Sequence, residues 1–131
     1  MSQKTLLIVD DVESLRDVLA SVLKDEGYNV FMAGNGKEGL MVLAAQKIDL
    51  LITDIFMPEM DGFELSMGVR NNYPQTKLII ISGGGTVRSG ARTNNFDAIQ
   101  AGQDLVNPDS ILKKPFAPSE LIELVATVLG E

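Results

Sequence analysis

Apolar and polar residues along the chain follow two alternating patterns. Short runs rich in leucine, isoleucine and valine predict β-strands, at residues 5–9, 29–32, 50–53, 78–81 and 110–113. Between and after these runs, apolar residues recur at every third or fourth position, which predicts helices over about 12–26, 37–46, 62–72, 96–106 and from 118 onward. Because a helix follows each strand, the pattern predicts an α/β fold of the form (βα)5. Its doubly wound, parallel five-stranded sheet is expected to have the order 2-1-3-4-5.

Glycine and proline residues mark the ends of several predicted elements. Gly27 is predicted to end the first helix as its C′ residue, and residues 34–36 form a predicted turn. Pro118 suits the first turn of the last helix. Residues 83–95 form the longest predicted loop, which is polar, basic and rich in glycine. We find no repeat or linker, so residues 1–131 are predicted to form a single domain.

Charged and polar side chains stand where the predicted strands end. Asp10 and Asp11 follow the first strand, Asp54 the third and Ser82 the fourth, while Lys114 comes directly after the fifth. Ligands of parallel sheets bind outside the carboxyl ends of the strands. We therefore expect three carboxylates, a hydroxyl and an ammonium group to meet in one crevice.

Three of these residues also have a plain structural explanation. Asp11 could cap the following helix, Ser82 could simply begin a loop, and Lys114 could be a solvated lysine, although its neighbour Lys113 suits that role better. Together, however, the carboxylates would repel one another by about 4 kcal/mol per close pair at an effective dielectric near 20. A hard cation such as Mg²⁺, or Mn²⁺, would relieve that repulsion. Asp54 is then the best candidate nucleophile, because carboxylates form aspartyl-phosphate intermediates.

Composition narrows the classes of function. The chain of 131 residues has no histidine and no cysteine, which excludes a Ser-His-Asp triad, a histidine- or thiolate-ligated metal and a disulfide framework. Its 18 acidic residues outnumber 11 basic ones, for a net charge of −7, which argues against direct nucleic-acid binding. No apolar run is long enough to span a membrane, and no signal peptide precedes the first strand. A cytoplasmic location is therefore expected.

The order of the strand-end residues resembles that of a known family. The motifs in question are Asp10-Asp11, Asp54, Ser82, Lys114-Pro115-Phe116 and the segment 54–62, DIFMPEMDG. Together they resemble the receiver domain of two-component response regulators, which has the CheY-like variant of the flavodoxin fold. The resemblance covers nearly the whole chain, and separated motifs that occur in this order are a specific signal.

The resemblance implies a role for each acidic residue. It makes Asp54 the phosphoacceptor. It gives Asp10 and Asp11 the binding of Mg²⁺, with Asp54 and the backbone carbonyl of Phe56 completing the protein ligands. The phosphoryl donor would be a phosphohistidine on a sensor histidine kinase or a histidine phosphotransfer protein. The absence of histidine in this chain is consistent with that division of labour.

The same resemblance makes Ser82 a switch hydroxyl that turns toward the phosphoryl group, and Lys114 a cation that contacts it. In this family the Lys-Pro peptide is typically cis, which implies a cis bond between Lys114 and Pro115. Phosphorylation would reshape the face formed by the predicted helix 96–106, strand 110–113 and last helix. That face would control an unidentified partner or output domain, and dimerisation through the last two helices is common in the family.

Three features depart from the family pattern. Ile111 stands where an aromatic switch residue is common, so we expect core packing there and little aromatic switching. Phe56 is apolar where many relatives are polar. It cannot orient an attacking water by hydrogen bonding, so slow loss of the phosphoryl group is expected. The loop 83–95 is longer than usual. Its arginines, Arg88 and Arg92, could reach the phosphoryl group or an acidic partner, but an insertion without a specific role is favoured.

Two other functions compete with the receiver. A phosphatase of the haloacid-dehalogenase class also uses an aspartate nucleophile, Mg²⁺, a serine or threonine and a lysine. It would place a second aspartate where Phe56 stands. A degenerate receiver that only binds proteins is disfavoured by the intact acidic set.

Overall fold

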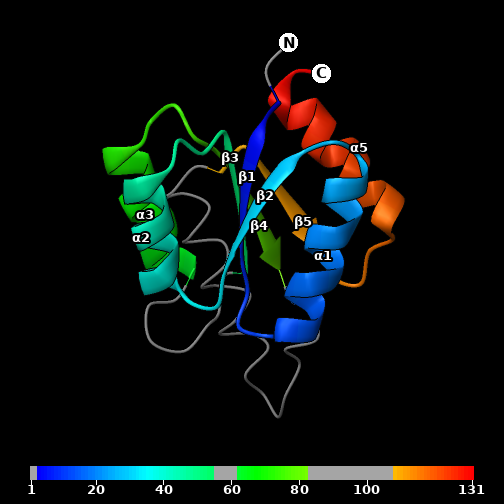
Figure 1. Cartoon of the computed structure of the whole chain (residues 1–131), viewed down its shortest axis with the longest axis horizontal. Coiled ribbons are helices and arrows are strands. Elements are labelled where there is room, and N and C mark those ends of the chain that lie inside the picture. The colour runs from blue at the N-terminus through cyan, green and yellow to red at the C-terminus, as the bar shows by residue number, and fades with distance from the viewer. Residues whose placement is uncertain (1–2, 55–61, 83–107) are drawn as a thin grey trace.

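The computed structural model describes residues 3–54, 62–82 and 108–131 (Figure 1). Within them lie the strands β1 (Thr5–Val9), β2 (Asn29–Ala33), β3 (Leu50–Asp54), β4 (Lys77–Ser82) and β5 (Ser110–Lys113). The helices of the same residues are α1 (Glu13–Asp25), α2 (Gly36–Ala45), α3 (Gly62–Asn72) and α5 (Pro118–Leu129). The predicted helix 96–106 and the loop 83–95 lie outside the described residues.

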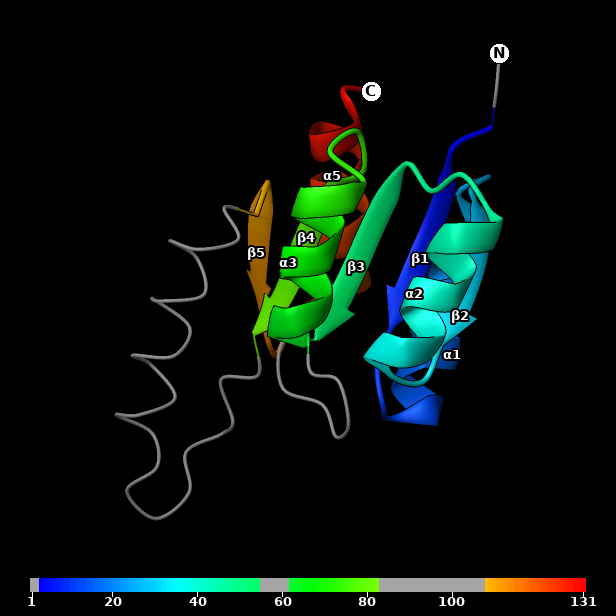
Figure 2. The same cartoon turned by 90° about the vertical axis from the view of Figure 1, so that its left-hand side faces the viewer.

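All five strands are parallel and form one sheet in the order β2-β1-β3-β4-β5, as predicted (Figure 2). Strands β1 and β5 have the predicted bounds, whereas β2, β3 and β4 extend slightly beyond their apolar runs. Asp54 is the last residue of β3 and Ser82 the last of β4, so both belong to the ladder and not to the loops that follow. Since the carboxyl ends of the strands point the same way, these residues lie together at that end of the sheet, which we call its carboxyl edge.

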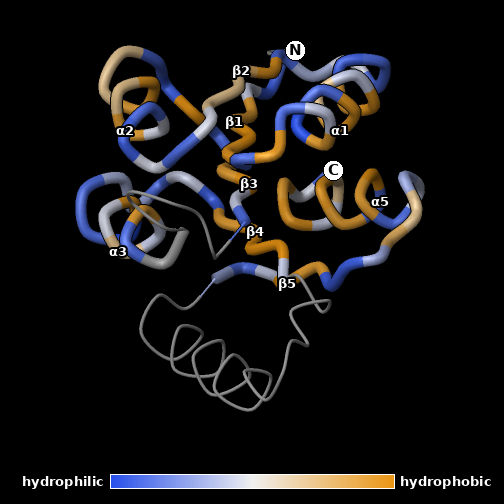
Figure 3. Tube along the Cα trace, turned by 90° about the horizontal axis from the view of Figure 1, so that it is seen from below, coloured by the Kyte–Doolittle hydropathy of each residue, from blue (hydrophilic) through white to orange (hydrophobic). Residues whose placement is uncertain are grey.

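Two layers of helices cover the sheet, with α1 and α5 on one face and α2 and α3 on the other (Figures 1 and 3). Side chains alternate between the faces along each strand. Leu6 and Ile8 of β1 pack into the core beneath α1 and α5, whereas Leu7 and Val9 pack into the core beneath α2 and α3. Strands buried on both faces explain the unbroken apolar runs in the sequence.

Helix α1 begins one residue later than its apolar pattern indicates. Val12 is the N-cap, with extended φ and ψ of −94° and 105°, and its amide donates to Oδ1 of Asp10 at 2.9 Å. The carboxylate that serves this turn is therefore that of Asp10, and the alternative in which Asp11 caps the helix is wrong. At the other end, Gly27 has a φ of +99° and is the C′ residue, as predicted.

Gly39 in α2 is buried and lies close to the sheet and to α3. A Cβ at Gly39 would lie 3.1 Å from Cγ2 of Val9 and 3.4 Å from a Cδ of Leu65. We expect Gly39→Ala to lower the free energy of unfolding by about 1–2 kcal/mol, because overpacking outweighs the better helix propensity of alanine. Urea denaturation would measure this change.

The matched control is Gly68→Ala in α3, where the nearest atom to a new Cβ is Cδ2 of Leu40 at 3.8 Å. This change should leave stability unaltered or raise it by up to about 1 kcal/mol. Equal effects at the two glycines would contradict the packing argument.

Candidate functional site

Three carboxylates gather at the carboxyl edge of the sheet, as the sequence predicts. Oxygen atoms of Asp10, Asp11 and Asp54 all lie within 4.8 Å of one another. They meet because β1 and β3 are neighbours, so that residues following one strand stand beside the end of the other. Asp10 is fully buried and Asp54 is 8% exposed, while Asp11 faces solvent. The described residues therefore offer a half-open, oxygen-only site of the kind that suits a hard divalent cation.

The buried carboxylate of Asp10 is only partly compensated by hydrogen bonds from the described residues. Its Oδ1 accepts the Val12 amide, but its Oδ2 is buried and has no hydrogen-bond partner among the described residues. Burial raises the pKa of Asp10, and the charges of Asp54 and Asp11 raise it further, against the Val12 hydrogen bond and the charge of Lys114. An orphaned buried oxygen beside two other carboxylates fits a bound cation, which would supply the missing ligand contact.

Lys114 lies inside this site. Its Nζ is 3.1 Å from Oδ2 of Asp54, and the Lys114 side chain is 28% exposed. The chain reaches this position because the Lys114 amide donates to the carbonyl of Ser82. The peptide between Lys114 and Pro115 is cis, as the resemblance implies. The alternative of a solvated surface lysine is therefore wrong for Lys114 and fits its exposed neighbour Lys113.

Ser82 stands at the same edge of the sheet. It is the last residue of β4, is 4% exposed and pairs with Lys113 in the parallel ladder. The sheet register places Asp54 opposite Ile81, so Ser82 lies one residue beyond the acceptor candidate. The alternative of a loop-starting serine does not hold, since Ser82 belongs to the strand. Phe56, whose carbonyl the resemblance assigns to the metal, lies outside the described residues.

Ile111 behaves as the core residue that the sequence indicates. It is half-buried and packs against the core beneath α2 and α3.

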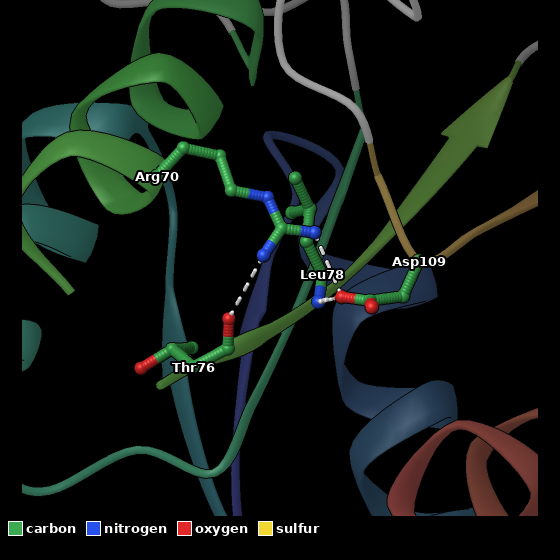
Figure 4. A network of polar contacts seen from close by, with 4 residues as sticks. All are labelled: Arg70, Thr76, Leu78 and Asp109. Carbon is green, nitrogen blue, oxygen red and sulfur yellow. Dashed lines mark hydrogen bonds and ion pairs between the residues drawn. The ribbon is translucent and has the colours of Figure 1, made fainter. Parts of the chain in front are cut away.

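At the amino ends of the strands, a polar network that sequence reasoning missed connects the start of β5 to its neighbours (Figure 4). Arg70 near the end of α3 donates to Oδ2 of Asp109 at 2.8 Å and to the carbonyl of Thr76 at 3.4 Å. The same Asp109 oxygen accepts the amide of Leu78, the second residue of β4. The Asp109 amide in turn donates to the Leu78 carbonyl. Asp109 thus starts the pairing of β5, the strand that leads to Lys114.

We expect the two members of this ion pair to differ in their contribution to stability. Asp109→Ala leaves the Leu78 amide without its acceptor and should lower the free energy of unfolding by about 1–2 kcal/mol. Arg70→Met removes a partly exposed charge pair, which solvent screens, and should lower it by about 1 kcal/mol or less. Urea denaturation of the two variants compares them. A larger loss for Arg70→Met would contradict this ranking.

Comparison with known proteins identifies the class to which this fold and site belong. A family model described as the response regulator receiver domain matches residues 6–126. The chain belongs to this family, as the resemblance indicates.

Several individual proteins are similar over nearly the whole chain. A putative NtrX-like response regulator of Rickettsia bellii is 35% identical over 95% of this chain. The transcriptional regulatory protein GlrR of Escherichia coli is 36% identical over 96%. This chain spans 24% and 26% of those two relatives, about a quarter of their length. By contrast, it spans 89% of an uncharacterized 14.6 kDa protein of Leptolyngbya boryana, at 38% identity.

Solved structures show the same fold. The crystal structure of a putative response regulator from Chloroflexus aurantiacus matches with a TM-score of 0.83 and 30% identity, and covers 99% of this chain and 100% of its own. Within the described residues, no helix has the length and apolar character needed to cross a membrane.

Proposed function

We propose that the chain is a phosphorylation-operated receiver that takes a phosphoryl group onto Asp54. The observation that carries this proposal is the meeting of three carboxylates with the Lys114 ammonium, 3.1 Å from Asp54, at the carboxyl edge of the sheet. The donor would be a phosphohistidine on a sensor histidine kinase or a histidine phosphotransfer protein. Asp10, Asp11 and Asp54, with the Phe56 carbonyl, would hold Mg²⁺ or Mn²⁺.

In the transfer step an Asp54 carboxylate oxygen attacks phosphorus and the phosphorus–nitrogen bond to the donor imidazole breaks. The bonding electron pair leaves with the imidazole nitrogen, which takes up a proton from water. A bound Mg²⁺ supplies charge neutralisation for the transferred group. Lys114 already lies beside the attacking carboxylate and would contact the phosphoryl oxygens, while Ser82 offers a hydroxyl donor at the same edge. The domain would thus assist its own phosphorylation. In dephosphorylation a water oxygen would attack phosphorus, the bond between phosphorus and the Asp54 oxygen would break, and inorganic phosphate would leave while the Asp54 carboxylate is restored.

The signal would leave through β5, because that strand connects Lys114 to the rest of the molecule. The proposed output face consists of β5, α5 and the predicted helix 96–106, which lies outside the described residues. To change the populations of the inactive and active conformations almost completely, phosphorylation must stabilise one over the other by about 5.5 kcal/mol. New contacts of Ser82 and Lys114 to the phosphoryl group would have to supply this difference. The output partner, the single-domain organisation of 1–131 and the cytoplasmic location stay predictions. Membership of the receiver family removes the reason to consider a haloacid-dehalogenase phosphatase further.

The test is phosphorylation by a small donor. Incubation with acetyl phosphate and Mg²⁺, followed by intact mass spectrometry, should show the addition of one phosphoryl group. Chelation of the metal should abolish that addition. A protein that gains no phosphoryl group under these conditions, although folded, would refute the proposal and support a receiver that only binds proteins.

A further inference from the structure

Asp10 is held by three separate contacts, two through its backbone and one through its side chain. Its amide donates to the carbonyl of Ala33 at 3.2 Å, and its Oδ1 accepts the Val12 amide at 2.9 Å. Its carbonyl accepts a hydrogen bond from Nη1 of Arg16 at 2.7 Å. The first two contacts come from the adjacent strand and the start of α1. The third comes from a half-buried, charged side chain one turn into α1, which nothing in the receiver mechanism above uses.

The guanidinium of Arg16 rests against Gly34 in the turn between β2 and α2. A Cβ at Gly34 would lie 3.2 Å from Nη1 and 3.9 Å from Cζ of Arg16, and 3.4 Å from Oε1 of Glu38. Positive φ occurs at Gly27 and Gly130 among the described glycines, so Gly34 is not required by its backbone angles. The contact with Arg16 therefore gives a specific reason for a residue without a side chain here.

The turn that contains Gly34 is itself fixed by α2. The Gly34 amide donates to Oε1 of Glu38 at 2.8 Å. Asn35 is the N-cap of α2, and its Oδ1 accepts the Glu38 amide at 2.9 Å. The guanidinium of Arg16 thus lies between the turn at Gly34, which is anchored to α2, and the backbone carbonyl of Asp10.

We propose that Arg16 is a positioning residue for the metal site. By holding the Asp10 carbonyl, it sets the orientation of the peptide between Asp10 and Asp11, and so directs both carboxylates toward Asp54. Gly34 supplies the space that its guanidinium needs. An arginine suits this task because its planar fork is pre-organised and its charge strengthens the hydrogen bond to the carbonyl. This inference rests on the proposed Mg²⁺ site.

The sign of the effect separates positioning from simple electrostatics. Arg16 carries a positive charge, and its Nη1 lies 2.7 Å from the backbone carbonyl oxygen of Asp10. If it acted only through that charge, its removal would make the site more negative and strengthen cation binding. If it orients the ligands, its removal weakens cation binding despite the more negative field. A merely structural role would change stability and leave the affinity for Mg²⁺ unaltered.

The experiment is calorimetric titration with Mg²⁺ of the wild type, Arg16→Met, Gly34→Ala and the control Lys37→Met. Arg16→Met should bind Mg²⁺ about tenfold more weakly, the size of effect typical when a partner of metal ligands is lost. Gly34→Ala keeps the charge but displaces the guanidinium, so its affinity should fall in the same direction by a smaller factor. Lys37 is exposed in the first turn of α2, and removal of its charge should leave binding unchanged or slightly tighter. Urea denaturation in the presence of a chelator checks that each variant is folded.

The outcomes are distinguishable. A folded wild type that binds no Mg²⁺ would overturn the proposed metal site, and the role of Arg16 with it. A wild type that binds Mg²⁺ beside an Arg16→Met variant that binds equally or more tightly would overturn the positioning role and leave the proposed function standing. Wild-type affinity in Gly34→Ala would overturn the part assigned to Gly34.

Discussion

The Asp54→Asn variant should take up no phosphoryl group from acetyl phosphate in the presence of Mg²⁺. The amide has nearly the shape of the carboxylate, but it lacks the anionic oxygen that attacks phosphorus. The variant also removes one of the three carboxylates of the site and the charge that pairs with Lys114. Intact mass spectrometry over a time course measures the uptake, and we expect it to fall to background.

The matched control for this substitution is Asp25→Asn. Asp25 is the last residue of α1, is exposed and lies outside the acidic cluster. The Asp25→Asn variant should take up the phosphoryl group at the wild-type rate, since the Asp25 carboxylate has no role in the site. Persistent uptake by folded Asp54→Asn would show that another residue is the acceptor and would remove Asp54 from its proposed role.

The Asp10→Asn variant should show two large effects of opposite sign. Mg²⁺ binding and Mg²⁺-dependent phosphorylation should fall at least about tenfold, because a ligand of the cation loses its charge. The metal-free protein should gain about 1–2 kcal/mol of stability. An asparagine keeps the acceptor for the Val12 amide and removes a buried charged oxygen that has no hydrogen-bond partner in the described part of the chain.

The stability difference between Asp10→Asn and the wild type should depend on pH. The folded-state pKa of Asp10 is raised above its ordinary value of 3.8. Folding therefore favours the protonated form, and the stability that protonation gives the metal-free wild type is fully present below 3.8. It is lost as the pH rises through the raised pKa.

The advantage of Asp10→Asn should accordingly be small in acid and largest near neutral pH. Urea denaturation of both proteins in a chelating buffer, across this pH range, measures the difference. A pH-independent difference would contradict the burial argument. Saturating Mg²⁺ should reverse the ranking, because it stabilises only the protein that binds it.

The sequence predicts the fold and the acidic cluster because both follow from simple periodicities. Buried parallel strands leave unbroken apolar runs, and the residues after such runs share one edge of the sheet. This reasoning places Asp10, Asp11 and Asp54 together without knowledge of any contact. It also separates Lys114 from Lys113, since successive residues at a strand end face different surroundings.

The supporting contacts could not be predicted in the same way. Arg16 reads as one more polar position on an amphipathic helix, and its contact with the Asp10 carbonyl depends on the angle at which α1 leaves β1. Gly34 reads as a turn residue, whereas its role depends on a side chain from another element. The choice between Asp10 and Asp11 as the acceptor for the Val12 amide likewise depends on local backbone angles that composition does not encode.

Among the described residues, the central sheet separates two cores that share no buried side chain. Leu51 and Ile52 are neighbours in β3, yet one packs beneath α2 and α3 and the other beneath α1 and α5. A sequence change that refits one helical layer therefore leaves the packing of the other in place. The two sides of this domain can diverge under separate constraints, and only the shared edge that carries Asp54 and Lys114 must satisfy both.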